Sequence, residues 1–563
     1  MIVPANVPVV LEATVWFFVK EQFRVVNDVF SLYNGSSPFL LPQKEFFNSI
    51  VILIYSSVPI DHGYVQDLNK LDFILGEFLY LNLIPKRVWV VVLVDKKKSK
   101  IGLLSFSDGR KRVHESLMDT VSKSESMIRE ALEKSNEVTI VSGNQIIWSP
   151  RRAVTEAKFL RSQEVAGVIF NIPVFAFPNF AGLAAAIINE PILLISQRNP
   201  SLPGLGGLLA AGGLLHQAGF YEERLWGSLQ DEEYMSNLLA FVRAAGARYR
   251  LRGSIYGYIG GRSMGMNTGM SAAPSEWLRI FGLDIEHIDQ LEIFRRASRI
   301  RSEVREKGVD WLEKNLGAVL YDGDKLTPEN LGFQVACYHA LKEIISEREL
   351  DFVGVKCHYE MSEYYCPQCL AAAFLPFDFD MEGPKKIVPM ACEADSDGAL
   401  TMHILYEISG MPPLFLDVRH FDKESNTYVL CNCGAQSLYY SKRSPNPLEN
   451  LSSVKIVPVI QKYSGVGGHL KYVGCSGELT FARLTRGIDG YHMLIFKGEA
   501  VNVPENKTRE SCEAWPHIYA NIKIGPDDLV HALQANHVHA VEGSFIKPLE
   551  KFCKMTNIKY TVL

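Results

Sequence analysis

Short apolar runs rich in β-branched residues alternate with helical stretches from Lys100 onward, and glycine and proline separate them. The segment Ser116–Lys134 has the periodicity of an amphipathic helix. Several of the runs are apolar throughout, which is typical of parallel strands covered by helices on both faces. The first four predicted strands are 101–106, 137–141, 166–170 and 191–195. We therefore predict a doubly wound α/β domain over 99–248.

The helical patterns become fewer beyond Tyr406, and apolar runs recur there with polar turns between them. These runs are 413–418, 427–430, 455–460, 478–481 and 492–496. Such a series predicts an antiparallel barrel or sandwich. The predicted fold class is α/β, with two doubly wound α/β domains at 99–248 and 249–408 followed by a mainly antiparallel β-barrel at 409–563.

Residues 1–98 form an extension with a different texture, in which the apolar patches 50–54 and 88–94 stand among irregular polar residues. A transmembrane helix needs about 20 apolar residues, so neither patch can span a bilayer. Two interpretations stay open. The patches are two buried strands of an added domain, or the whole segment is an upstream extension wrongly joined to the chain.

Composition narrows the classes of function. The 563 residues are 47% hydrophobic and 21% charged with a formal net charge of -5, so no basic surplus favours nucleic acid. Ten cysteines are too sparse for a disulfide scaffold, and no signal peptide is evident. We expect a cytoplasmic protein without a nucleic-acid or membrane partner.

Two glycine-rich segments invite a ligand-binding interpretation. The segment 203–215 lacks the ordered G-x-G-x-x-G spacing after a strand, so it predicts a closely packed helix of small residues. The segment 256–265 follows a possible strand and lets a ligand approach the backbone, although a plain turn explains it as well.

Four acidic residues surround the end of one strand and the end of the next. Asp395 and Asp397 precede a helical pattern, where acidic residues commonly cap the helix. Glu393 lies on the strand side of the same turn, and Asp417 ends an apolar strand. Ligand sites in α/β sheets collect at such strand ends, so Glu393 and Asp417 are either metal ligands or structural acids.

Two C-terminal histidines complete the candidate donors. On a strand, His537 and His539 would share one face. Carboxylate oxygen together with imidazole nitrogen suits Mn²⁺, Mg²⁺ or Fe²⁺ better than a thiolate-rich zinc site. The alternative is one surface histidine and one structural histidine.

The cysteine pairs Cys366/Cys369 and Cys431/Cys433 do not have the usual zinc spacing, because the second pair is C-x-C. No helix N-terminus is evident beside Cys366 and Cys369 that would lower a thiol pKa for redox chemistry. We interpret these four residues as ordinary buried cysteines.

Several blocks in collinear order resemble the L-fucose isomerase family, particularly its D-arabinose-using members, over about 99–563. The blocks are 99–116 with its D-G-R turn, 175–180, 260–266, 281–290, 353–357, 391–395 and 414–417. In that family a glutamate and an aspartate 24 positions apart bind one metal with a late histidine. Glu393 and Asp417 are 24 positions apart, and the histidine is His537, with His539 as the alternate.

The resemblance implies a metal-dependent aldose-ketose isomerase that acts on L-fucose, D-arabinose or a related sugar through a cis-enediol. The implied cofactor is Mn²⁺, or Mg²⁺ or another divalent metal. Glu393 and Asp417 would be ligands and also acid/base groups. Which of the two removes the C2 proton stays open.

Further sugar contacts follow from the same resemblance. Arg110 in the D-G-R turn matches a sugar-hydroxyl contact, and Tyr440 and Trp515 are candidates for stacking or hydroxyl contacts, although a surface arginine and core packing are the alternatives. His358 stands where the family commonly has glutamine, so it is assigned to the substrate site while the sugar itself stays open.

The family assembles as a symmetric homo-oligomer, usually a hexamer, with sites near subunit boundaries, and we expect the same here. Two other functions compete with catalysis of isomerisation. One is a non-catalytic sugar-binding or regulatory protein with an isomerase fold, because fold does not determine function. The other is a metal-dependent hydrolase or aldolase, for which the chain offers no added nucleophile.

Overall fold

The computed structural model describes residues 51–53, 89–91, 98–270, 273–434 and 436–563. The chain divides into two compact units, Met1–Lys97 and Lys98–Leu563. In the first unit, β1 (Val51–Leu53) pairs in parallel with β2 (Trp89–Val91), so each apolar patch contains a short strand. The rest of the predicted extension up to Lys97 lies outside the described residues.

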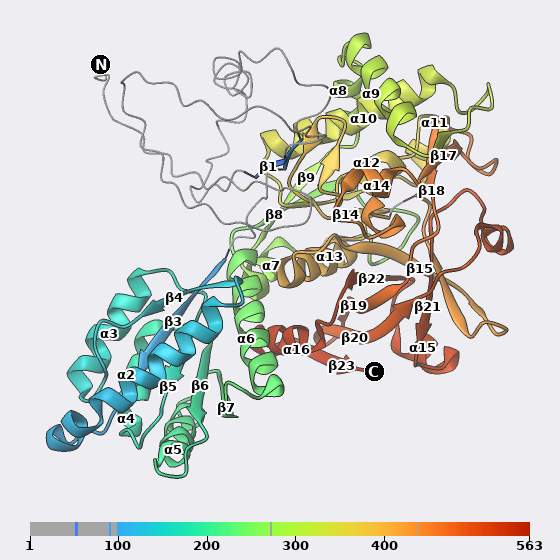
Figure 1. Ribbon diagram of the computed structural model, residues 1–563. Coiled ribbons are helices and arrows are strands. Elements are labelled where there is room, and N and C mark those ends of the chain that lie inside the picture. The colour runs from blue at the N-terminus through green and yellow to red at the C-terminus, as the bar shows by residue number, and fades with distance from the viewer. Residues whose placement is uncertain (1–50, 54–88, 92–97, 271–272, 435) are drawn as a thin grey trace, which may run out of the picture. The chain divides into compact units, whose positions relative to one another are not determined.

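The second unit begins with a five-stranded parallel sheet in the order β4-β3-β5-β6-β7 (Figure 1). Its strands are β3 (Ser99–Ser105), β4 (Val138–Ser142), β5 (Gly167–Asn171), β6 (Ile192–Gln197) and β7 (Glu222–Gly227). The helices that connect and follow them are α2 (Lys111–Glu133), α3 (Pro150–Ser162), α4 (Pro178–Ile188), α5 (Gly204–Gln217) and α6 (Glu232–Leu251). The glycine-rich segment 203–215 therefore forms the helix α5, as its composition predicts.

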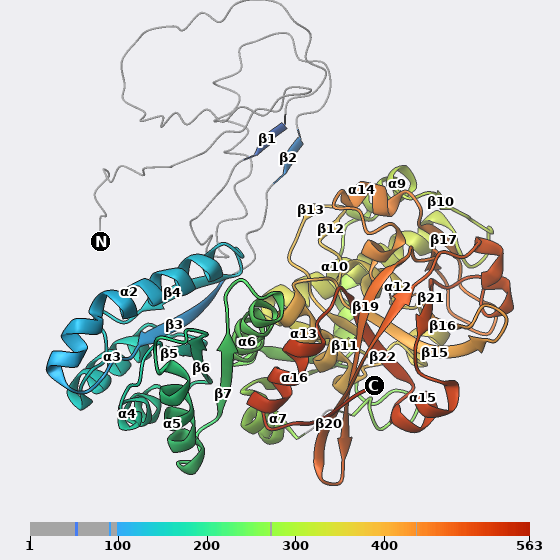
Figure 2. The ribbon, with the colours of Figure 1, turned by 60° about the horizontal axis from the view of Figure 1, so that its bottom comes forward.

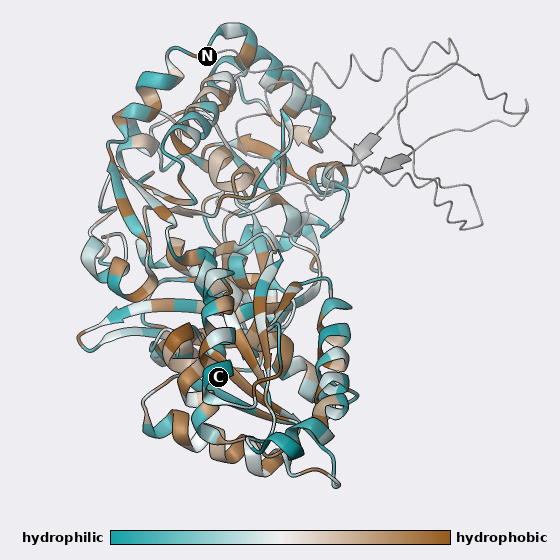
Figure 3. Cartoon of the chain, turned by 90° about the vertical axis from the view of Figure 1, so that its left-hand side faces the viewer, coloured by the Kyte–Doolittle hydropathy of each residue, from teal (hydrophilic) through white to brown (hydrophobic). Residues whose placement is uncertain are grey.

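Helices cover both faces of this sheet. Leu104 and Phe170 pack with α3, α4 and α5, whereas Leu103 and Ile169 pack with α2 and α6. Neighbouring residues of one strand are thus buried on opposite faces, which explains the continuous apolar runs in the sequence. Figure 3 shows hydrophobic strands enclosed between helices.

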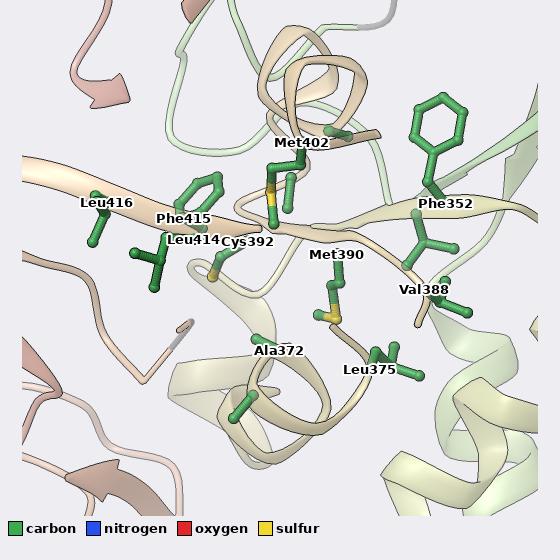
Figure 4. Close-up of a cluster of buried hydrophobic side chains, with 14 of the residues drawn as sticks. Phe352, Ala372, Leu375, Val388, Met390, Cys392, Met402, Leu414, Phe415 and Leu416 are labelled. Carbon is green, nitrogen blue, oxygen red and sulfur yellow. The ribbon is translucent and has the colours of Figure 1, made fainter. Parts of the chain in front are cut away.

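A second parallel sheet has the strand order β14-β11-β8-β9. Its strands are β8 (Ile255–Ile259), β9 (Asp284–Ile288), β11 (Phe352–Val355) and β14 (Met390–Cys392). The helices of this region are α7 (Pro274–Phe281), α8 (Leu291–Ala297), α9 (Ser302–Asn315), α10 (Pro328–Glu347), α11 (Glu360–Tyr364), α12 (Cys369–Phe374) and α13 (Ser396–Ser409). Figure 4 shows Met390 of β14 between Leu375, which follows α12, and Met402 of α13, so β14 is buried on both faces.

The C-terminal sheet is mixed. Its strands are β15 (Leu414–Asp422), β16 (Thr427–Cys431), β19 (Gly477–Gly487), β20 (Gly490–Ala500), β21 (His517–Ile522), β22 (His537–Glu542) and β23 (Lys559–Val562). The order is β19-β22-β15-β16-β21-β20-β23, and β19 also pairs with β20, whereas β23 joins β20 in parallel. A ring of pairings is what a barrel requires. The barrel itself stays a prediction.

Short elements fill the space around these sheets. The strands β10 (Ala318–Val319), β17 (Lys455–Pro458) and β18 (Gly468–Lys471) form one small sheet, and β12 (Phe379–Asp380) and β13 (Gly383–Pro384) form a two-stranded one. The remaining helices are α14 (Pro447–Leu451), α15 (Pro526–Ala532), α16 (Ile546–Met555) and the 3-10 turns η2 (Leu438–Ser441) and η3 (Glu505–Glu510).

The helix α6 packs against both α13 and α16, and so joins the first parallel sheet to the rest of the second unit (Figures 1 and 2). The predicted domain boundaries at 99, 249 and 409 stay predictions. Within the described ranges, no helix is long and apolar enough to cross a membrane.

A buried ion pair ties α13 to the C-terminal sheet. Asp395 is the N-cap of α13, and its side chain accepts a hydrogen bond from the Gly398 N–H at 2.9 Å. The same carboxylate accepts two bonds from Arg483 of β19, at 2.6 and 3.1 Å, and both side chains are fully buried. Removing one partner of such a pair leaves an uncompensated charge in the interior.

We therefore expect Arg483→Met to lower the free energy of unfolding by about 3–5 kcal/mol, because the Asp395 carboxylate loses its main counter-charge inside the protein. Denaturant unfolding at constant pH measures this change. The control is Arg295→Met, which removes an exposed ion pair with Glu292 and should leave the unfolding midpoint nearly unchanged. Equal midpoints for the two variants would contradict the structural role of the buried pair.

Candidate functional site

Three loops meet at the carboxyl edge of the second parallel sheet. The loop after β8 carries Met264 and Met266, the loop after β11 carries His358, and the loop after β14 carries Glu393. Their side chains line a cavity of about 250 Å³. Ligands of open α/β sheets bind in this position, because the loops that follow the strands converge there.

A tight turn places the carboxylate of Glu393 in this cavity. Directly after β14, Glu393 and Ala394 have φ angles of 61° and 52°, in the left-handed region that residues with a side chain rarely adopt. Such a residue costs about 1–3 kcal/mol and persists only where its surroundings hold it. Here the following residue, Asp395, is locked as the α13 N-cap, so the turn between β14 and α13 cannot relax.

The C-terminal sheet supplies the facing groups. Asp417 of β15 pairs directly with His537 of β22, and Phe415 pairs with His539, so these side chains share one face of the sheet. The Nε2 atom of His537 lies 3.3 Å from Glu393 Oε2 and 3.5 Å from Asp417 Oδ1. The structure thus brings together the glutamate, the aspartate and the favoured histidine.

A hydrogen bond orients the His537 ring. The distance from Nδ1 to Asp395 Oδ2 is 2.7 Å, so Nδ1 donates and Nε2 is turned toward Glu393 and Asp417. A carboxylate behind a histidine is the usual support of a metal ligand. Burial opposes the charged ring, but the hydrogen bonds to Asp395 and Glu393 outweigh it and raise the pKa of His537 to about 10.

His539 faces a different partner. Its Nε2 lies 3.0 Å from Nη1 of Arg483, which also binds Asp395. Burial, and then the charge of Arg483, hold the pKa of His539 well below its ordinary value, so the ring is neutral and accepts from the guanidinium. This geometry favours His537 over His539 as a metal ligand.

The two candidate carboxylates have different surroundings. Burial raises the pKa of Asp417, whose oxygens accept hydrogen bonds from Asn432 at 2.9 Å and Asn536 at 3.3 Å. Burial also disfavours ionised Glu393, but the hydrogen bond and charge of His537 outweigh it and lower the pKa of Glu393. Two acids with pKa values pushed apart can hold and release protons separately.

The donor set of Glu393, Asp417 and His537 suits a divalent cation. Neighbouring ligands of an octahedral ion with bond lengths of 2.0–2.1 Å lie about 3 Å apart, and His537 Nε2 lies 3.3 and 3.5 Å from one oxygen of each carboxylate. Among the described residues, the donor atoms that all lie within 4.8 Å of one another are those of His358, Glu393 and Cys433, so the Glu393 and Asp417 carboxylates must draw closer together to hold one ion with His537. A single cation would replace the proton that His537 otherwise shares with Glu393. Oxygen and imidazole ligands match the chemistry predicted from the sequence.

The opposite side of Glu393 carries two further donors. The Nε2 atom of His358 lies 3.7 Å from Glu393 Oε1 and 3.4 Å from Cys433 Sγ. The hydrogen bonds from Cys392 and His358 lower the pKa of the Cys433 thiol. Burial opposes a charged His358, but the contacts with Cys433 outweigh it and raise the pKa of that ring. The two shifts have the same cause, because the contact between Cys433 and His358 favours the thiolate and the imidazolium together.

Cations and an indole form the mouth of the cavity. Trp515 lines it, with the guanidinium of Arg419 at 5.6 Å and the Nζ of Lys462 at 5.2 Å from its ring. Arg419 is the extra residue at an irregularity of β15, a feature that re-aims side chains beside active sites. The indole N–H of Trp515 is buried and has no acceptor among the described residues, so it can donate to a bound molecule.

Two predicted sugar contacts lie outside this cavity. Tyr440 is fully buried, and its hydroxyl donates to the Pro412 carbonyl and accepts from the Glu542 N–H. Arg110 follows the carboxyl end of β3, where it binds Asp108 through two guanidinium nitrogens and stays largely exposed.

Several residues of the site are not evident from sequence patterns. Asp395 is the helix cap that its position predicts, and it also orients His537 and binds Arg483. Asn536 and Asn432 both donate to Asp417. The position of Asn536 directly before His537 points to the site, whereas nothing in the sequence around Asn432 links it to Asp417. A helix also begins at Cys369, contrary to the expectation, but burial raises the pKa of that thiol and gives no support to redox chemistry.

Comparisons with known proteins identify the family to which the chain belongs. The model of the L-fucose isomerase first N-terminal domain matches residues 98–253, and that of the C-terminal domain matches residues 430–563. The chain is 24% identical to a sulfoquinovose isomerase of Priestia aryabhattai over 76% of this chain and 92% of the relative. A sulfoquinovose isomerase of Alkalicoccus urumqiensis is 23% identical over 60% of this chain and 73% of the relative.

Among solved structures, an ABC transporter solute-binding protein from Burkholderia multivorans covers 46% of this chain and 81% of its own, with 9% identity and a TM-score of 0.14. A similarity of that strength carries no argument. The two domain matches and the sulfoquinovose isomerase relatives show that the chain belongs to the L-fucose isomerase family and is an aldose-ketose isomerase.

Proposed function

We propose that the chain is a divalent-metal-dependent isomerase that interconverts an aldose and a ketose through a cis-enediol, with Glu393, Asp417 and His537 as the metal ligands. The observation that carries the proposal is the approach of Glu393 Oε2 and Asp417 Oδ1 to within 3.3 and 3.5 Å of His537 Nε2 at one end of a cavity. The proposed cofactor is Mn²⁺, with Mg²⁺ or another divalent metal as the alternative.

When bound, the metal supplies Lewis-acid polarisation of the sugar carbonyl. The chain's own residues supply the proton transfer. Glu393 and Asp417 face the cavity from opposite elements, the turn after β14 and the strand β15, so each can take or return a proton at C1 or C2. Asn432 and Asn536 hold the Asp417 carboxylate in place by donating to both of its oxygens.

The remaining walls bind and orient the sugar. Trp515 offers an indole N–H that has no acceptor within the described part of the chain, and His358 faces the cavity beside Glu393. Burial of Glu393 and His537 keeps bulk water away from the reacting end, which strengthens the electrostatic interactions there. Arg110 is proposed to contact the sugar from a neighbouring copy, in the homo-oligomer, a hexamer, that the family implies.

The substrate is proposed to be L-fucose, D-arabinose or a related sugar, and among related sugars an anionic one is favoured. Arg419 and Lys462 line the mouth of the cavity, and neither forms an ion pair within the described residues. Two unpaired cations attract an anionic group. The relatives are named sulfoquinovose isomerases. Sulfoquinovose carries a sulfonate at the end of the sugar that is remote from its carbonyl.

We expect Glu393→Gln and Asp417→Asn each to reduce the turnover number by about 10²–10⁴-fold, because each removes a ligand charge and a proton carrier. Ketose formation in the presence of Mn²⁺ measures the rate, and circular dichroism shows whether the fold is kept. The matched control is Asp422→Asn, at the far end of β15, where the carboxylate binds Lys507 outside the cavity. Rates near those of the unmodified protein in either site variant would refute the assignment.

Metal content distinguishes the two histidines. We expect His537→Gln to weaken Mn²⁺ binding by at least about 10–100-fold, because the imidazole Nε2 that faces both carboxylates is lost. His539→Gln should retain the metal, since that ring accepts from Arg483 instead. Equilibrium dialysis followed by elemental analysis measures both. Loss of metal in the His539 variant alone would reverse the assignment.

A panel of aldoses tests the function and the substrate together. We expect the purified protein with Mn²⁺ to convert sulfoquinovose with a lower KM than L-fucose or D-arabinose, and a chelator to abolish turnover. The double variant Arg419→Ala/Lys462→Ala should raise the KM for sulfoquinovose about tenfold and change that for the neutral sugars little, because hydrogen bonds to a charged group are lost.

The control for this test is Lys423→Ala, an exposed lysine of the same region that does not line the cavity. Equal effects of the double variant on neutral and anionic sugars would contradict the role of the cation pair. Absence of turnover on every sugar, with metal bound, would contradict the proposed reaction.

A further inference from the structure

A second group of metal-binding side chains shares Glu393 with the proposed catalytic site. His358, Glu393 and Cys433 each offer one donor atom, these atoms lie within 4.8 Å of one another, and all three side chains are buried. They come from three different loops, after β11, β14 and β16. The folded chain alone brings them together, since 75 positions separate the histidine from the cysteine.

The separations are those of a tetrahedral ion with a sulfur ligand. Bond lengths of about 2.3 Å to sulfur and 2.0–2.1 Å to nitrogen or oxygen require N···S of about 3.6 Å and N···O of about 3.4 Å. The observed distances from His358 Nε2 are 3.4 Å to Cys433 Sγ and 3.7 Å to Glu393 Oε1. Cys433 Sγ and the Glu393 oxygen lie within 4.8 Å of each other, so a single cation fits between the three atoms once these two draw together by up to about 1 Å.

The His358 ring is held in the orientation that a ligand needs. Ser362 Oγ donates to the Tyr359 carbonyl at 3.1 Å, so it accepts from His358 Nδ1 at 2.9 Å. The second nitrogen, Nε2, is thereby directed at Cys433 and Glu393. A hydrogen bond on the far nitrogen is the common support of a metal-binding histidine.

The two carboxylate oxygens of Glu393 face two different sets of donor atoms. Its Oε2 lies toward His537, and its Oε1 lies toward His358. One carboxylate can therefore bridge two cations, as carboxylates do in two-metal sites. The first position has only oxygen and imidazole donors, whereas the second adds a thiol sulfur, and soft sulfur ligands select zinc-like ions over Mn²⁺ or Mg²⁺.

We propose that His358, Glu393 and Cys433 form a second, thiolate-containing cation site for Zn²⁺ or a chemically similar ion, beside the Mn²⁺ position and bridged to it by Glu393. The open side of this site faces the cavity, where the Tyr463 hydroxyl lies 3.1 Å from His358 Nε2. An ion there adds positive charge to the wall that contacts the sugar. The second cation site does not depend on the proposed isomerisation, although Glu393 belongs to both sites.

Co²⁺ titration of the metal-stripped, full-length protein tests this site, because a Co²⁺–thiolate bond produces a charge-transfer absorption that oxygen and nitrogen ligands do not. We expect two Co²⁺ ions per chain and one thiolate band. Cys433→Ala should lose the band and one of the two ions. Cys553→Ala, which removes a buried thiol in α16, should keep both and serves as the matched control.

Asp417→Asn separates the two proposals. The thiolate band should persist in this variant, because Asp417 belongs only to the first position, even where isomerase activity is lost. Cys433→Ser gives a second probe of the thiol should the alanine variant fail to fold. Saturation of the unmodified protein at one Co²⁺ without a thiolate band, or a band that survives in both Cys433 variants, would overturn the second site.

Discussion

The buried ion pair between Asp395 and Arg483 is the interaction on which the rest of the site depends. Asp395 caps α13, accepts two hydrogen bonds from β19 and holds the Nδ1 atom of His537 on β22. A carboxylate with that many donors is stabilised in its charged form, and its pKa lies well below the ordinary range because Arg483 and His537 outweigh the cost of burial. Three elements are thereby held at one point.

The position of that pair determines where the chemistry can occur. Asp395 follows Glu393 by two residues, so the turn that locks the cap also directs the Glu393 carboxylate. His537 is oriented from behind by the same acid and pairs across the sheet with Asp417. The site therefore lies where the carboxyl edge of a parallel sheet meets one face of a mixed sheet, and neither sheet contains it alone.

The two ends of the cavity favour ligand groups of opposite charge, and each end concerns one of the two proposals. Its base combines carboxylates, the imidazole of His358 and a thiol, which favour cations, whereas its mouth has Arg419 and Lys462 against the ring of Trp515, which favour an anion. A sugar with a carbonyl at one end and an anionic group at the other satisfies both ends. The thiol of Cys433 gives one side of the base a softer character than the other.

The sequence by itself determined the features that follow from hydrophobic periodicity, which are the buried strands and the turns between strands. Continuous apolar runs predicted the parallel strands, since burial on both faces removes alternation, and the polar turns predicted the C-terminal strands. The strand β7 has no such run, because three of the six residues in Glu222–Gly227 are charged, as an edge strand allows. The spacing of Glu393 and Asp417 and the shared face of His537 and His539 were also visible in the sequence.

Only the tertiary structure decided between the two histidines, because that choice depends on which one faces Glu393 and which one faces Arg483. The same is true of Cys433, whose neighbours His358 and Glu393 come from distant loops, and of Tyr440, whose hydroxyl is used within the core. Local periodicity follows from neighbouring residues and can be predicted from them. The partners of a buried polar group come from strand register and loop packing, which no local pattern contains.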